Sequence, residues 1–136
     1  METLYLYIDY GLIFLRLAIG ASFLVHGIQK LRMWKMRPDE QISKSMININ
    51  RLLSIVEPLG AIALMIGFLT QYAALGLMII MLGAIYIKIK VWRKKFSEKG
   101  GWEMDLIILA GLSVLFLVGA GYYSLDIYIL IRQLGA

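Results

Sequence analysis

The stretch "LIILAGLSVLFLVGAG", residues 106–121, is apolar on every side of a helix, and this constrains the fold more than any other feature. A helix on the surface of a soluble bundle carries a polar face at a period of 3.6 residues. A helix that is apolar all round is instead typical of a membrane span. The whole chain agrees, because 60% of its 136 residues are hydrophobic and its mean hydropathy is +0.76.

Four stretches are long enough to cross a membrane. About 30 Å of hydrocarbon takes roughly 20 apolar residues per helix, and residues 10–31, 52–70, 72–91 and 104–123 qualify. We therefore predict an all-α fold, an integral membrane four-helix bundle, in which residues 1–136 form a single domain.

Two segments outside these spans also carry structural signals. Between Met33 and Asn50, Pro38 followed by two acidic residues favours the start of an amphipathic helix that lies on the membrane surface. The tail "IYILIRQLGA" fits a short interfacial helix with Ser124 or Asp126 near its cap, although its alternation also fits an extended segment.

Basic residues flank the first and third connections and are nearly missing from the second connection and from both ends. The positive-inside rule then predicts a multi-pass protein of the cell membrane with both basic connections cytoplasmic and both termini outside. This clustering is not that of a nucleic-acid-binding surface, so we expect membrane lipid, not nucleic acid, as a partner.

Ionisable residues inside spans are expensive and are candidates for function. Their depths predict two clusters. The inner cluster contains His26, Lys30 and Glu57, with Gln29 and Glu103 as further members. The outer cluster contains Arg16, Asp126 and Asp9. Glu57 could hold a proton or bind a polar head group, or it could form a salt bridge that locks two helices together.

We expect no intrinsic cofactor in this chain. With one histidine and no cysteine, the sequence offers no pair of axial haem ligands and no thiolate metal site. Any redox role needs a borrowed cofactor or a partner's thiols. Glycines spaced seven apart, such as Gly20 and Gly27 or Gly76 and Gly83, predict close helix packing.

Three segments together carry a resemblance: "RLAIGASFLVHGIQKL", "EPLGAIALMIGFLTQYAALGLMIIMLGAIY" and "GGWEMDLIILAGLSVLFLVGAGYYSLD". The chain resembles the DoxX family of small four-span bacterial and archaeal membrane proteins. The matching positions are Arg16, Gly20, His26, Gly27, Lys30, Glu57, Gly60, Gly67, Glu103, Ser124 and Asp126. Pro58 in "EPLG" and the long basic segment before the second span depart from the family pattern.

The resemblance implies a role in quinone-linked respiration. Related proteins are subunits of thiosulfate:quinone oxidoreductase and of terminal quinol oxidase assemblies, and others belong to thiol and oxidative-stress systems. Our first hypothesis is therefore a quinone-interacting subunit of a membrane redox complex, with His26, Lys30, Glu57 and Glu103 at the quinone and Arg16, Ser124 and Asp126 in the outer polar cluster.

Two alternatives stay open. The chain could be a non-catalytic membrane anchor or assembly subunit for other redox proteins. It could also be a carrier for a small solute or lipid, although four spans without an inverted repeat would then require a homo-oligomer.

Overall fold

The computed structural model describes residues 2–31, 34 and 44–135, with side chains from residue 7 onward. These residues form five helices and no strand, which confirms the all-α prediction. The helices are α1 (Glu2–Leu31), α2 (Lys44–Ile66), α3 (Thr70–Lys90), α4 (Glu103–Val118) and α5 (Leu125–Leu134). The surface helix predicted around Pro38 lies partly outside the described residues, and from Lys44 onward it is continuous with α2.

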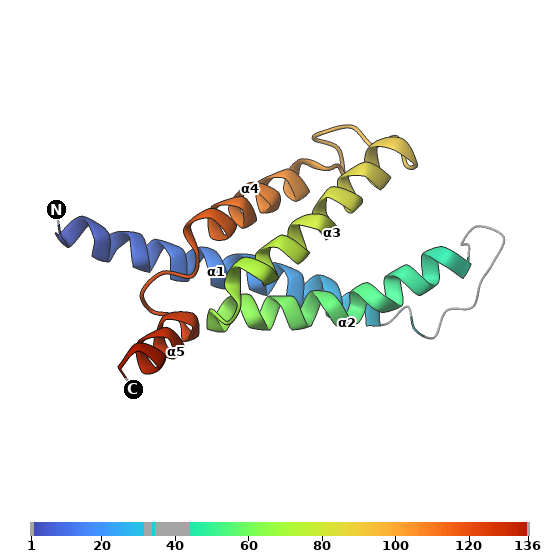
Figure 1. Ribbon diagram of the computed structural model, residues 1–136. Coiled ribbons are helices and arrows are strands. Elements are labelled where there is room, and N and C mark those ends of the chain that lie inside the picture. The colour runs from blue at the N-terminus through green and yellow to red at the C-terminus, as the bar shows by residue number, and fades with distance from the viewer. Residues whose placement is uncertain (1, 32–33, 35–43, 136) are drawn as a thin grey trace.

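The helices pack as two antiparallel pairs. Helix α1 packs mainly against α2, helix α3 packs mainly against α4, and contacts between α2 and α3 join the pairs. Both termini and α5 lie at one end of the bundle, and the connection between α3 and α4 lies at the other end (Figure 1). Segments far apart in the sequence therefore meet at the same level.

Three helical segments of the described chain are long and apolar enough to cross a membrane: Tyr7–Leu31, Lys44–Ile66 and Thr70–Lys90. Helix α4 is shorter than the predicted span over 104–123, because it ends at Val118. Its 16 residues extend about 24 Å at 1.5 Å per residue. Gly119 ends the helix with a φ of 85°, a conformation that residues with a side chain rarely adopt.

Small residues let α1 and α2 approach closely. A Cβ atom on Gly20 would lie 2.3 Å from Cγ of Met65, and one on Gly27 would lie 2.4 Å from Cγ of Pro58. These two glycines confirm the predicted packing. Gly76 and Gly83 do not, because a Cβ at either position meets no atom within 4 Å.

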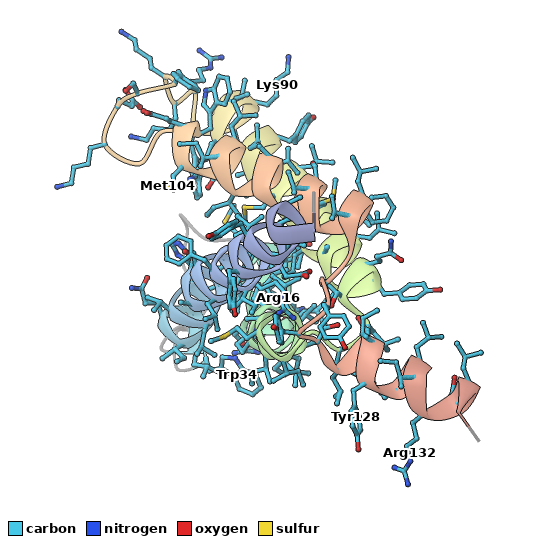
Figure 2. All side chains as sticks on the ribbon, turned by 90° about the vertical axis from the view of Figure 1, so that its left-hand side faces the viewer. Arg16, Trp34, Lys90, Met104, Tyr128 and Arg132 are labelled. Carbon is cyan, nitrogen blue, oxygen red and sulfur yellow. The ribbon has the colours of Figure 1, made fainter. Side chains whose placement is uncertain are left out.

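The tail forms the helix that we predicted with Ser124 at its start. The Ser124 hydroxyl oxygen accepts the Ile127 amide at 3.3 Å, so Ser124 is the N-cap of α5. None of the described residues of α5 is buried. Tyr128 and Arg132 point away from the other helices (Figure 2).

Candidate functional site

Polar side chains gather at two levels of the bundle, as the depths in the sequence predict. We call Lys30 and Glu57 the Glu57 pair, and we call Asp9, Arg16, Ser124 and Asp126 the Arg16 cluster. The Glu57 pair joins the last turn of α1 to the middle of α2. The Arg16 cluster lies where α3 begins and where the chain passes from α4 to α5.

The Glu57 pair is a short ion pair with one partner buried. Lys30 Nζ donates to Glu57 Oε1 at 2.5 Å. The Glu57 side chain is 1% exposed and that of Lys30 is 28% exposed, so within the described residues the lysine is the partly accessible side of the pair. Glu57 Oε2 is buried and has no hydrogen-bond partner among the described residues. The pair thus retains one free acceptor.

Close helix packing positions this pair. Pro58 follows Glu57 directly, and its ring occupies the space in which Gly27 would carry a side chain. Because Gly27 has none, α1 can approach α2 here, and Lys30 on the next turn of α1 reaches Glu57. Helix α2 continues through Pro58 as a helix.

The predicted inner cluster is only partly formed, since the other three candidates lie elsewhere. His26 and Gln29 are exposed on α1. Glu103 is exposed at the start of α4, where its carboxylate accepts the Ser97 hydroxyl at 2.7 Å. In the described structure Glu57 is bonded to Lys30 and Glu103 to Ser97, so the two carboxylates do not pair with each other. Position along a helix predicts the depth of a residue in the bundle. It does not predict which way the side chain points, because a helix that is apolar all round has no polar stripe to mark its outer face.

A second ion pair, Lys88 with Asp105, escaped the sequence reasoning. Lys88 Nζ lies 2.7 Å from Asp105 Oδ2 and joins α3 to α4, as the Glu57 pair joins α1 to α2. Lys88 also donates to the Gly101 carbonyl at 3.2 Å. The sequence does contain a signal for this ion pair, because the end of α3 and the start of α4 must lie at the same level when the two helices are antiparallel.

Arg16 is buried at the opposite level, with 2% of its surface exposed. Its Nη2 donates to the Tyr123 carbonyl at 2.8 Å, whereas Nε and Nη1 have no partner within the described chain. Asp9, also on α1, accepts the Tyr122 amide at 2.8 Å. Figure 2 shows Arg16 among the helices, close to the segment that follows α4. Two side chains of α1 thus hold the irregular backbone after α4.

Asp126 caps α3 from a distant part of the chain. Its carboxylate accepts the Leu69 amide at 2.6 Å and the Thr70 amide at 3.0 Å. Its own amide donates to the Gly67 carbonyl at 2.9 Å. A carboxylate at a helix N-terminus satisfies free amides and opposes the positive end of the helix dipole. Asp9, Arg16 and Asp126 thus lie at the same end of the bundle, and the hydrogen bonds of all three side chains go to backbone groups.

Comparison with known families gives one match. The family model described as DoxX matches residues 11–89, more than half of the chain. This range includes both members of the Glu57 pair. No curated protein and no solved structure matches the chain.

Proposed function

The chain belongs to the DoxX family and is an integral membrane protein, and from this premise we propose that it is a quinone-interacting subunit of a membrane redox complex. The match runs from within α1 through α2 to the last turn of α3. The quinone site that we propose is the Glu57 pair.

One observation carries the proposal: Glu57 Oε2 is a buried acceptor without a partner in the described part of the chain. A buried polar atom in this state costs free energy unless a ligand or water completes it. The head group of a reduced quinone fits, because its hydroxyl can donate to this carboxylate oxygen, whereas the carbonyl of the oxidised form can accept from Lys30. A bound quinone would supply the two-electron chemistry, and a partner subunit would supply the electron donor.

The chain's own residues would bind and exchange protons. Lys30 would donate to an oxygen of the head group from the partly exposed side of the pair. Glu57 Oε2 would accept or return a proton. His26 is exposed one turn before Lys30 on α1, within the region through which a quinone would approach from lipid. Glu103, which the sequence placed with this group, is bonded to Ser97, and the site that we propose does not include it.

The test is the quinone content of the protein purified gently from its native membrane, measured by mass spectrometry of the extract. Glu57→Gln should lower quinone per protein while the protein remains folded. Asp105→Asn is the matched control, since it alters a carboxylate with a lysine partner in the other helix pair. Equal quinone in both variants, or none above a control membrane protein, would contradict the proposal.

A second candidate, a membrane anchor or assembly subunit, is favoured by the way the charges are used. Three contacts each join separate elements of the chain: Lys30 with Glu57, Lys88 with Asp105, and Asp126 with the start of α3. Under this alternative, Glu57→Gln would reduce the folded protein and its copurifying partners together. A folded variant that keeps its partners and loses quinone would exclude it.

A further inference from the structure

A hollow of about 490 Å³ lies at the Arg16 end of the bundle, separate from the Glu57 pair. It is lined by residues 69–72 at the start of α3, by residues 118–122 at the end of α4 and just after it, and by Ser124, Asp126 and Ile127. Its size is that of a small-molecule site, which typically measures roughly 300–1,000 Å³. Exposed Tyr72 and Tyr122 lie on its lining, so the hollow is open to the surroundings of the bundle.

Thr70, a residue of this lining, carries an unsatisfied hydroxyl. The residue is 1% exposed, and its Oγ1 has no hydrogen-bond partner among the residues that the structure describes. Its amide is already bonded to Asp126 Oδ2, so only the hydroxyl remains. Because a hydroxyl both donates and accepts, it can bind a carbonyl or a hydroxyl oxygen of a ligand.

The charges around the hollow favour an uncharged ligand. The Asp126 carboxylate would repel an anion, although it is held by the Leu69 and Thr70 amides. The positive end of the α3 dipole and the nearby Arg16 guanidinium would repel a cation. These opposing charges offset one another, so neither a phosphate nor an amine gains from entering.

Apolar side chains line the rest of the hollow. Leu69, Val118 and Ile127 belong to its lining and come from three different elements. Helix α4 ends at Val118, several residues short of a full span, so the hollow begins where a longer helix would continue. A ligand with an apolar chain can therefore enter from the membrane and bring its head group toward Thr70.

We propose that this hollow binds the uncharged, oxygen-bearing head group of a molecule with an apolar chain, with the Thr70 hydroxyl as its hydrogen-bond partner. Two sources share this chemistry: the glycerol ester region of a neutral lipid and the ring of an isoprenoid quinone. The site is distinct from the Glu57 pair and stands whether or not that pair binds quinone.

The experiment measures the thermal stability of the purified full chain in detergent, with and without each of two probes, dioctanoylglycerol and decylubiquinone. A probe that binds the folded state raises Tm, and the increase grows with the probe's concentration and affinity. We expect a Tm increase in the wild type that Thr70→Val removes. Ser113→Ala is the matched control, because the Ser113 hydroxyl bonds the Leu109 carbonyl within α4, and it should keep the full increase.

The probe that raises Tm identifies the source, and an increase with either one supports the site. Val118→Trp provides a second variant that fills the hollow from an exposed lining position and should also remove the increase. Neither probe raising Tm, or an undiminished increase in Thr70→Val or Val118→Trp, would overturn the proposal. If Thr70→Val does not fold, Val118→Trp alone decides.

Discussion

Gly67 allows the most specific prediction of the fold. Its φ is +70°, and an added Cβ would lie 2.1 Å from Arg16 Nη1 and 2.6 Å from Ser124 Cβ. The left-handed conformation costs an alanine roughly 1–2 kcal/mol, and forcing a methyl group into a packed site costs roughly 1–3 kcal/mol. Gly67→Ala should therefore lower the free energy of unfolding by about 2–4 kcal/mol, allowing for partial relaxation of the Arg16 side chain.

Two further glycines separate these contributions. Gly100 has a φ of +78° and no atom within 4 Å of an added Cβ, so Gly100→Ala should lose only the conformational part, about 1–2 kcal/mol. Gly76 lies inside α3 with equally open space, and Gly76→Ala should stabilise the protein by about 0.5–1 kcal/mol. Circular dichroism during unfolding in detergent would measure all three. A Gly67→Ala variant no less stable than Gly100→Ala would refute the close approach of Arg16 to Gly67.

The ion pair and the α3 cap give two more predictions. Lys30→Met should destabilise the protein by about 3–5 kcal/mol, because it leaves the buried Glu57 carboxylate unpaired. Glu57→Gln should cost less stability, because the partly exposed Lys30 side chain can turn to water. Equal losses of the two variants in unfolding measurements would contradict this asymmetry. Asp126→Ala should lower the free energy of unfolding by about 1–2 kcal/mol. It should also speed amide hydrogen exchange at Leu69, at Thr70 and along α5, because it removes two hydrogen bonds that join α5 to the start of α3. Unchanged exchange in α5 would show that Asp126 does not hold this helix.

The sequence predicts the depth of each polar residue in the bundle better than it predicts which residues that side chain contacts. Depth correctly grouped Lys30 with Glu57 and Arg16 with Asp126, because the rise per residue is fixed in a helix. It also grouped His26 with Glu57, although His26 is exposed. In a soluble helix the apolar stripe shows which face is buried, but a membrane helix is apolar on the lipid side as well.

Helix ends were a second source of error. Hydropathy continues past Val118, so the fourth span was predicted to reach residue 123, whereas the helix ends before Gly119. Gly119, with its φ of 85°, is a local stop signal that hydropathy does not register. The path of the chain after it depends on tertiary bonds that sequence patterns do not contain, because Arg16 and Asp9 hold the backbone of Tyr123 and Tyr122 from another helix. Ser124, in contrast, was found as a cap, because capping is a local property of the chain.

The most direct test of the quinone proposal is infrared difference spectroscopy of the protein reconstituted with quinone, recorded as the quinone is reduced and reoxidised. If Glu57 exchanges a proton with the head group, the spectrum contains a protonated carboxyl band that is lost in Glu57→Gln and kept in Asp105→Asn. The same band in both variants, or no carboxyl band in the wild type, would contradict a proton-exchanging role for Glu57.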